Sequence, residues 1–324
     1  MFAVYASGVN AEDPLSCLSL GEFQAPPTPE DWVTVNVKAV SVNHHDLWAL
    51  RGTALTADQA PMILGTDAAG ITEDGREVIV HGVIGDPAKG RGDETLDPKR
   101  SLLSEIYPGT MAAQVRVPAR NLIDKPAEIS WEEAACLPTA WLTAYRMLVT
   151  KSGAQKGDLV LVQGAAGGVA TAAIVLGKAL GLRIWVTSRD EDKRAWAKNL
   201  GAEEAFETGA RLPEKVDAVV ESVGEATWSH SLRSLRPGGT IVTCGATSGG
   251  AANADLNRVF FLQLKVEGST MGTAEELRGL VELLVSSGAR PVIDRVLPIS
   301  EAAEAFAVMN NGEVRGKIVL TVGE

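Results

Sequence analysis

The sequence has few cysteines and histidines, with three and four of them among 324 residues. The cysteines, Cys17, Cys136 and Cys244, are scattered along the chain, and none belongs to a CxxC pair. A disulfide framework and a structural zinc site both need closely spaced thiols, so this pattern argues against both. We therefore expect three reduced and mostly buried thiols.

Positive charge and long apolar runs are also scarce. Lys and Arg number 30 against 41 acidic residues, which gives a formal net charge of −11. Nucleic acids and anionic membrane surfaces bind to basic faces, so neither is an expected partner. No apolar run approaches the ~20 residues that span a bilayer, and the first residues do not have the pattern of a signal peptide. We expect a soluble, intracellular and cytoplasmic protein.

What is present falls into two parts that meet near residue 125. The first third predicts β-structure, most clearly over residues 33–43, where apolar residues alternate with polar or small ones. After residue 125, buried strands and helices alternate regularly, which is typical of a doubly wound parallel sheet and an α/β fold. The predicted strands cover residues 158–164, 183–188, 216–224 and 240–246, and the predicted helices cover 167–181, 191–201, 227–239 and 274–288.

The first of these strands runs into a glycine-rich loop, and a helix follows at once. Glycine permits a tight turn and a close approach of the backbone to a pyrophosphate, to which the helix N-terminus offers free N–H groups. The context predicts a dinucleotide-binding loop, although a glycine turn without a ligand is the alternative. Ala170 stands where a third glycine is usual, so we expect slightly looser packing of helix on strand there. The predicted cofactor residues of the loop are Gly164, Ala165, Gly167, Gly168 and Val169.

The end of the second strand indicates which dinucleotide binds. NAD sites usually carry an acid there, about 20 residues after the loop, to bind the ribose 2′-hydroxyl. This chain has Ser188 followed by Arg189, with Lys193 one helical turn further on. A hydroxyl and a guanidinium suit a 2′-phosphate, which predicts NADP(H) as cofactor. The alternative is that Arg189 and Lys193 are solvated surface charges.

Six segments in this order resemble the medium-chain dehydrogenase/reductase superfamily, most closely its zinc-free, quinone oxidoreductase-like branch. The resemblance implies a β-rich, GroES-like catalytic domain from residues 1–124 and 271–324, a Rossmann domain from 125–270, and substrate in the cleft between them. It also implies a homodimer joined at the edges of the Rossmann sheets, with 260–270 as the edge strand. The segments are NHHDLWALRG (43–52), LGTDAAG (64–70), EEAACLPTAWLTAYRML (132–148), GAAGGV (164–169), RPGGTIVTCGATSG (236–249) and GKIVL (316–320).

Compared with zinc-containing relatives, all three catalytic ligand positions are changed. Their cysteine falls at Asn43, their histidine at Thr66, and their second cysteine near Pro138. The segment corresponding to their structural zinc loop, residues 85–100, has no cysteine. A catalytic zinc needs three imidazole, thiolate or carboxylate ligands, so we expect no metal. Adjacent histidines at 44 and 45 on an extended chain would point to opposite sides and would not share an ion easily.

The resemblance implies roles for the remaining site residues. His44 would face the cofactor phosphates, and His45 takes the place of a hydroxyl that relays protons in zinc enzymes. Asn43 and His45 are the predicted catalytic donors to a substrate oxygen, although a packing role at the domain boundary is the alternative for His45. His81 and His230 are expected to have no role in the reaction. Further predicted cofactor contacts, mostly at strand ends, are Thr143, Ser222, Val223, Gly245, Ala246 and Met271.

These observations predict an NADPH-dependent, zinc-independent oxidoreductase. It would transfer hydride to a quinone or an α,β-unsaturated carbonyl compound, a small-molecule substrate in either case. One alternative is a zinc-free alcohol or ketone oxidoreductase, because neutral donors and His45 can also serve that reaction. The other is an NADPH-binding protein with little turnover, in which the cofactor-binding residues are retained and the catalytic site is degraded.

Overall fold

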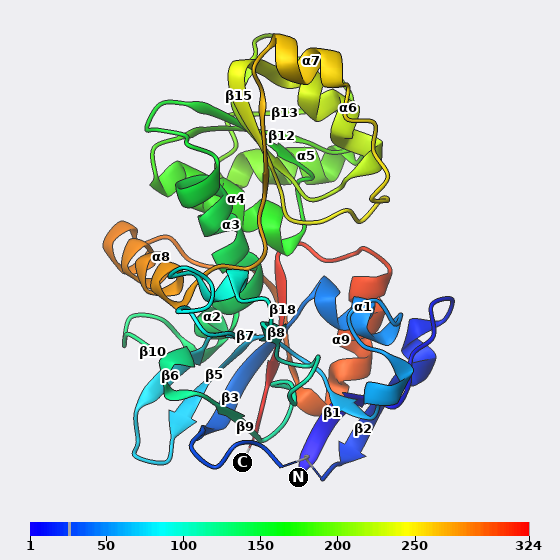
Figure 1. Ribbon diagram of the computed structural model, residues 1–324, viewed down its shortest axis with the longest axis vertical. Helices are drawn as coiled ribbons and strands as arrows, with labels where there is room; N and C mark the ends of the chain where they lie inside the picture. Colours follow the sequence, from blue (N-terminus) through cyan, green and yellow to red (C-terminus); the bar gives the residue numbers. More distant parts are fainter. Residues whose placement is uncertain (25–26, 324) are drawn as a thin grey trace. The chain divides into compact units, whose positions relative to one another are not determined.

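The chain of this computed structural model, described over residues 1–24 and 27–323, divides into two compact units (Figure 1). Unit 1 comprises Met1–Ala140, Thr273–Val285 and the chain from Pro291 on, and unit 2 comprises Trp141–Gly272 and Ser286–Arg290. None of the helices among the described residues is long and apolar enough to cross a membrane.

The first division between the units lies at Ala140, whereas the sequence predicted it at residue 124. The difference comes from helix α2 (Trp131–Ala135), which packs on strands β3 (Val33–Val42) and β5 (Ala68–Thr72) of unit 1. The helical pattern of the sequence therefore begins before unit 1 ends, because α2 still belongs to unit 1.

Unit 1 is built on a seven-stranded sheet in the order β10-β6-β5-β3-β18-β17, with β9 also pairing with β3. Strand β18 pairs with β3 so that Ile318 lies opposite Val42, which brings the C-terminal tail against the end of β3. A three-stranded sheet, β2-β1-β4, and the pair β7-β8 complete the β-structure of the unit. The remaining strands are β1 (Phe2–Ala6), β2 (Leu18–Glu22), β4 (Met62–Ile63), β6 (Glu77–Val80), β7 (Val83–Ile84), β8 (Ser101–Leu102), β9 (Gln114–Val117), β10 (Leu122–Asp124), β17 (Ile293–Pro298) and β18 (Lys317–Thr321).

Three more helices accompany these sheets. Helix α9 places Phe306 in the core of the unit, and α1 contributes Leu47 and Leu50 to the same core. The helices are α1 (His44–Leu50), α8 (Ala274–Ser287) and α9 (Ala302–Asn310).

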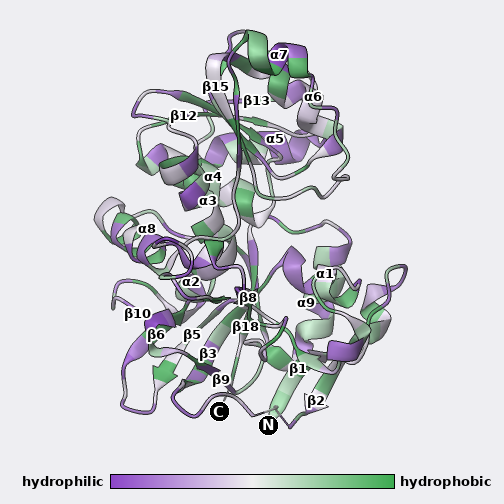
Figure 2. Cartoon of the chain, viewed as in Figure 1, coloured by the Kyte–Doolittle hydropathy of each residue, from purple (hydrophilic) through white to green (hydrophobic). Residues whose placement is uncertain are grey.

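Unit 2 is a six-stranded sheet in which every described pair is parallel, in the order β13-β12-β11-β14-β15-β16. This is the Rossmann order. Its ligand-binding switch point lies between β11 and β14, which are the first and fourth strands of this sheet in chain order and are neighbours in space. All five residues of β11 are buried, whereas Figure 2 shows α5 mostly in the hydrophilic colour, as expected of a helix on the outside of a sheet. The strands are β11 (Leu159–Gln163), β12 (Arg183–Thr187), β13 (Glu204–Phe206), β14 (Val216–Glu221), β15 (Leu235–Thr243) and β16 (Lys265–Gly268), and the helices are α3 (Leu142–Arg146), α4 (Gly168–Ala179), α5 (Glu191–Leu200), α6 (Glu225–Ser234) and α7 (Leu256–Phe261).

Two predicted elements of unit 2 have different bounds. Helix α6 ends at Ser234 instead of residue 239, because Leu235 already pairs with Val216 and Pro237 cannot continue a helix. The predicted edge strand 260–270 is confined to β16, because its first residues finish α7.

Candidate active site

The segment with two adjacent histidines is the start of helix α1. Asn43 is extended, and its backbone N–H donates to Oδ2 of Asp46 at 2.8 Å, which is the capping arrangement that begins the helix. His44 and His45 are therefore helical, and the prediction of an extended chain at this point is wrong. Adjacent helical residues are about 100° apart, so the two rings still diverge.

Asp46 is a fully buried carboxyl at this helix start. Its second oxygen, Oδ1, accepts from the backbone N–H of Gly65 at 3.1 Å. Burial raises the pKa of Asp46 to about 6, although the neighbouring His45 and the Asn43 N–H act in the opposite direction. Asp46 thus joins the loop of Gly65 to the helix that carries both histidines.

A buried ammonium lies beside the helix start. Lys317 Nζ donates to Asn43 Oδ1 at 2.5 Å and to the carbonyl of Val42 at 3.0 Å, and it lies 3.3 Å from Asp67 Oδ2. The same Asp67 oxygen accepts from Ser41 Oγ at 2.5 Å and from Asn43 Nδ2 at 2.8 Å. We call Ser41, Asn43, Asp67 and Lys317 the Lys317 cluster; all four side chains are buried. The amide of Asn43 is engaged at both ends within it.

The residues at the zinc-ligand positions do not fit a zinc ion. Asn43 and Thr66 offer an amide and a hydroxyl, and Thr66 Oγ1 lies 2.8 Å from Thr139 Oγ1, next to Pro138. Zinc in proteins prefers thiolate, imidazole and carboxylate ligands, and the Lys317 ammonium would repel a second cation. Among the residues that the structure describes, no three His, Cys, Asp or Glu side chains are grouped to hold a metal.

His45 is paired with a carboxylate that the sequence analysis missed. Its Nε2 lies 3.2 Å from Oε1 of Glu105, a partner 60 residues away in the sequence. Glu105 also accepts from the backbone N–H of Leu102 at 2.8 Å and from Ser101 Oγ at 3.4 Å. Burial alone would raise the pKa of Glu105, but the hydrogen bonds from His45 and Leu102 outweigh it and hold that pKa below its usual value. Glu105 is therefore ionised at neutral pH.

His44 is exposed and lies on the positive side of the same helix. Its ring is 6.4 Å from that of Trp48. Desolvation lowers the pKa of His44, and the positive charges of Lys317 and Arg51 lower it further. These two charges disfavour a further positive charge on the ring, and the predicted contact of His44 with the cofactor phosphates stays a prediction.

The second missed pair involves His81. This buried ring has its Nε2 3.3 Å from Oε1 of Glu94, and the same oxygen accepts from the backbone N–H of Ala274, where α8 begins. The pair ties the cysteine-free segment 85–100 to α8 within unit 1. The expectation that His81 has no role in the reaction stays a prediction.

In unit 2 the glycine loop has the open backbone that a pyrophosphate needs. Gly164 has a φ of 93°, and a Cβ added to Gly164 or Gly167 would meet no atom within 4 Å. Gly167 precedes α4 without a side-chain cap, so the first N–H groups of this helix remain for a ligand. The close packing expected of a third glycine is supplied instead by Gly177, where a Cβ would lie 2.4 Å from Ile184.

The residues predicted to bind the 2′-phosphate of the cofactor follow β12. Ser188 Oγ accepts from the backbone N–H of Asp190 at 3.2 Å, and Asp190 caps α5 by accepting from the N–H of Lys193 at 3.0 Å. The carbonyl of Ser188 accepts from Arg194 at 2.7 Å. The acid at 190 is thus engaged in capping, and the side chain of Arg189 is exposed next to the strand end.

The end of β14 is shaped by a buried carboxylate, Glu221, which the sequence analysis also missed. Glu221 accepts from the backbone N–H groups of Val223 and Gly224, at 2.8 and 3.0 Å, and from the hydroxyls of Thr227 and Ser231. These bonds fix the predicted cofactor residues Ser222 and Val223 in a tight turn before α6.

A neighbouring network explains His230. Gln163, at the end of β11, accepts from Thr187 Oγ1 at 2.5 Å and donates through Nε2 to His230 Nδ1 at 2.9 Å. His230 Nε2 lies 2.8 Å from the carbonyl of Ala210. The network joins the ends of the neighbouring strands β11 and β12, and His230 has a structural role there.

The other predicted cofactor residues lie at several places in unit 2. Thr143 is buried in α3, and Met271 is buried with a φ of 51°, which is unusual for a residue with a side chain. Gly245 and Ala246 follow β15 in a partly exposed turn.

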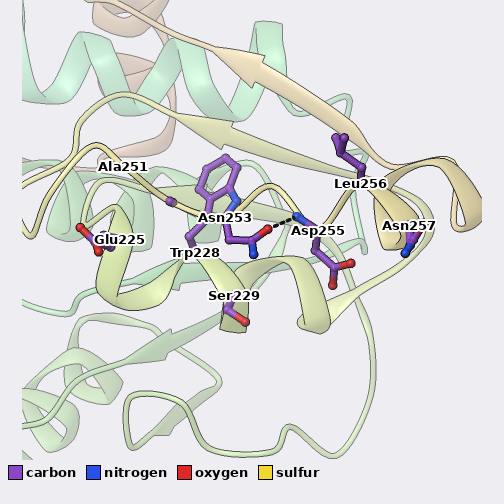
Figure 3. A pocket seen from close by; sticks show the side chains of 9 residues that line it. Glu225, Trp228, Ser229, Ala251, Asn253, Asp255, Leu256 and Asn257 are labelled. Atoms are coloured by element: carbon purple, nitrogen blue, oxygen red, sulfur yellow. Dashed lines mark hydrogen bonds between the residues drawn. The ribbon is translucent and has the colours of Figure 1, made fainter.

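A cavity of about 650 Å³ lies elsewhere in unit 2, between α6, α7 and the segment that joins β15 to α7 (Figure 3). Its lining includes Glu225, Trp228, Asn253 and Asp255, and Asn253 Oδ1 accepts from the backbone N–H of Asp255 at 2.9 Å. None of the predicted cofactor residues lines this cavity.

A parallel sheet in Rossmann order with an open glycine loop defines a dinucleotide-binding protein. Residues 29–127 match the model of the alcohol dehydrogenase GroES-like domain, and residues 168–286 match that of the zinc-binding dehydrogenases. The chain belongs to the medium-chain dehydrogenase/reductase superfamily. The predicted GroES-like β-rich domain and Rossmann sheet are thereby confirmed.

Similar proteins include both alcohol dehydrogenases and reductases of unsaturated thioesters. A solved structure described as an NAD-dependent alcohol dehydrogenase is 32% identical, with a TM-score of 0.90 and full coverage of both chains. The crotonyl-CoA carboxylase/reductase of Cereibacter sphaeroides is 27% identical over 94% of this chain and 84% of its own length. A solved 2-octenoyl-CoA carboxylase reductase in complex with NADP and 2-octenoyl-CoA is also 27% identical, with a TM-score of 0.88, covering 98% of this chain and 87% of its own.

Proposed function

We propose that this protein is an NADP(H)-dependent reductase that works without a metal and delivers hydride to the β-carbon of an α,β-unsaturated carbonyl compound. The observation that carries the proposal is the Lys317 cluster, because it replaces a Lewis acid with a buried, fully bonded ammonium. An unsaturated thioester is the first substrate class, since two of the similar proteins reduce or carboxylate such compounds by name. A quinone remains within the proposal.

The cofactor site of the proposal lies in unit 2. Gly164, Gly167 and the N-terminus of α4 would hold the pyrophosphate, and Ser188 and Arg189 would hold the 2′-phosphate. Bound NADPH supplies the hydride. One similar structure is described as NAD-dependent, which would favour NAD(H). We propose NADP(H) because this chain has Ser188, and no acid, at the position that binds the ribose 2′-hydroxyl in NAD sites.

The reaction favoured by the site is conjugate reduction. Hydride addition to the β-carbon places negative charge on the carbonyl oxygen, which hydrogen-bond donors can stabilise without a metal. Oxidation of an alcohol also requires removal of a hydroxyl proton, for which zinc relatives use their Lewis acid. His45 is the proposed donor. Asn43 stays a proposed second donor, although its N–H groups would first have to leave Asp67.

The alternative reactions are open to the same protein. Similarity to an NAD-dependent alcohol dehydrogenase favours a zinc-free alcohol or ketone oxidoreductase, with His45 as acid and base. A protein that binds NADPH with little turnover would keep the glycine loop and lack an active proton donor.

An isotope experiment that locates the transferred hydride in the product distinguishes the conjugate reductase, the alcohol or ketone oxidoreductase and the binding protein. NADPH carrying deuterium at its transferable position is incubated with crotonyl-CoA, and separately with an aldehyde, and the products are examined by NMR. We expect deuterium at the β-carbon of the saturated thioester. Deuterium at the carbinol carbon of an alcohol, with no labelled thioester, would support the alternative oxidoreductase. No labelled product with either acceptor and no oxidation of NADPH with a quinone, while NADPH still binds, would support a binding protein.

We also propose that two copies of the chain pair through the edge of the unit 2 sheet. Strand β16 is the last strand in the order, so its outer edge is unpaired in the described chain. Phe260, Phe261 and Val266 near this edge are 68%, 78% and 49% exposed. An unpaired edge beside exposed apolar side chains is typical of an association surface.

A further inference from the structure

The pair formed by His45 and Glu105 determines which nitrogen of the His45 ring carries a proton. Glu105 lies on the segment after β8, and its ionised Oε1 faces Nε2 of His45 at 3.2 Å. A carboxylate can only accept, so Nε2 carries the proton in both the neutral and the charged ring. The other ring nitrogen, Nδ1, is buried and has no hydrogen-bond partner among the described residues.

Several contacts hold Glu105 in this orientation. Its Oε2 accepts from the N–H of Leu102 at 2.8 Å and from Ser101 Oγ, and its own carbonyl accepts from Gln59 Nε2 at 3.0 Å. The side chain of Glu105 is 26% exposed and that of His45 is 11% exposed, so the pair is partly shielded from solvent. Glu105 is therefore fixed independently of His45.

The charged groups that act on the His45 ring come from two elements. Glu105 faces it from the segment after β8, and Asp46 follows it on α1 and interacts with its charge. Glu105 alone contacts a ring nitrogen, so it alone determines which nitrogen is available to a substrate.

We infer that Glu105 is the positioning residue of the proton donor: it holds His45 through Nε2–H and leaves Nδ1–H as the proton that completes the reduction. This inference rests on the proposed function. Hydride from NADPH forms the new C–H bond at the β-carbon, and the electron pair of the C=C bond moves onto the carbonyl as an enolate. The enolate then takes the Nδ1 proton, and the ring remains neutral with its proton on Nε2. That neutral tautomer is the one that the Glu105 carboxylate stabilises, and solvent returns the proton to Nδ1.

The test uses Glu105→Gln in the full chain, with Glu105→Asp and a surface control. Gln keeps a side-chain oxygen as acceptor and removes the charge, whereas Asp keeps the charge on a shorter side chain. Glu77→Gln is the control, because Glu77 is an exposed unit 1 glutamate paired with Lys125 at 3.0 Å. The first readout is the pH profile of kcat for NADPH-dependent reduction of crotonyl-CoA. The second is the NMR signals of the His45 ring nitrogens, which report which nitrogen carries the proton and are assignable because the chain has four histidines.

We expect Glu105→Gln to lower kcat on the order of 10–100-fold at neutral pH with little change in KM. The alkaline limb of its kcat profile should move to lower pH, and the ring-nitrogen signals of His45 should show the proton shared between Nδ1 and Nε2. Glu105→Asp should restore part of the rate, and Glu77→Gln should match the wild-type protein in both readouts. An active enzyme whose pH profile is unchanged by Glu105→Gln, or whose His45 ring proton stays on Nε2, would overturn the inference alone. A wild-type protein that reduces no unsaturated thioester and no quinone would remove the proposed function, and the proton-donor role of the pair with it.

Discussion

The ammonium of Lys317 lies 3.3 Å from Oδ2 of Asp67, with both side chains buried. Within the same cluster the Asn43 amide donates to Asp67 and accepts from Lys317. The positive charge of this site therefore belongs to a lysine side chain of the protein. The neighbouring side chains of Asn43 and Asp67 are held in place by their bonds to it.

The first prediction concerns the stability that depends on this ammonium. Lys317→Met keeps the length of the side chain but leaves the Asp67 carboxylate buried without its counter-charge. We expect the free energy of unfolding to fall by about 3–5 kcal/mol. Denaturant unfolding measures it, and Lys198→Met is the matched control. Lys198 forms an exposed pair with Glu204, so its loss should cost below about 1 kcal/mol.

A double variant makes this prediction sharper. Asp67→Asn added to Lys317→Met removes the unpaired charge, so it should recover part of the lost stability. Equal losses in Lys317→Met and Lys198→Met would show that the cluster does not depend on a buried charge pair.

The second prediction concerns Asp46 and the pH dependence of stability. The pKa of Asp46 in the folded protein is raised to about 6 from an ordinary 3.8. As pH rises between these values, the unfolded chain loses this proton while the folded protein keeps it, so the contribution of Asp46 to stability falls. Asp46→Asn removes the titration. The wild-type stability minus the variant stability should therefore decrease from about pH 4 to about pH 6 and then stay constant.

Urea unfolding of both proteins at a series of pH values tests this. Other carboxylates, such as Glu94 and Glu105 with their lowered pKa values, contribute equally to both proteins and cancel in the difference. A difference that increases over the same window would mean that the folded protein holds Asp46 ionised.

The third prediction concerns the choice of cofactor. Ser188→Asp places a carboxylate where the 2′-phosphate is proposed to bind, so KM for NADPH should rise on the order of 10-fold or more while KM for NADH does not. Ser229→Asp is the matched control, because Ser229 lines the separate cavity near α6. A larger effect of Ser229→Asp on NADPH would place the cofactor at that cavity instead of at the end of β12.

The fourth prediction concerns the edge of the unit 2 sheet. Phe261→Asp introduces a charge at a side chain that is 78% exposed in the single chain. If the edge is the association surface, the wild-type protein should have the mass of a dimer by light scattering, and the variant should shift towards the monomer. A monomeric wild-type protein would exclude the proposed homodimer.

Much of the fold could be predicted because it is encoded locally. The alternation of buried strands and helices after residue 125 and the glycine loop at 164–169 are contiguous patterns, and both appear in unit 2 where they were expected. The error at His44 and His45 also had a local cause. The helix there has seven residues, and its signal is the N-cap pairing of Asn43 with Asp46, which lie on either side of the two histidines.

The missed site residues depend on contacts between distant parts of the chain. Lys317 belongs to the quoted motif GKIVL, but its partner Asn43 is 274 residues away and meets it only because β18 pairs with β3. Glu105 is a single acid in an irregular segment, 60 residues from His45. Local pattern does not specify such pairings. The pair of Lys317 and Asn43 follows from the register of β18 on β3, and the pair of Glu105 and His45 follows from the folded path of an irregular segment.

The central claim is a reduction that needs NADPH and no metal. The most direct measurement is the rate of NADPH oxidation with crotonyl-CoA by chelator-treated protein, repeated after addition of Zn²⁺ and with NADH in place of NADPH. We expect the same rate before and after chelation, no gain from Zn²⁺, and a lower kcat/KM with NADH. A protein that is inactive after chelation and regains its activity with Zn²⁺ would contradict it.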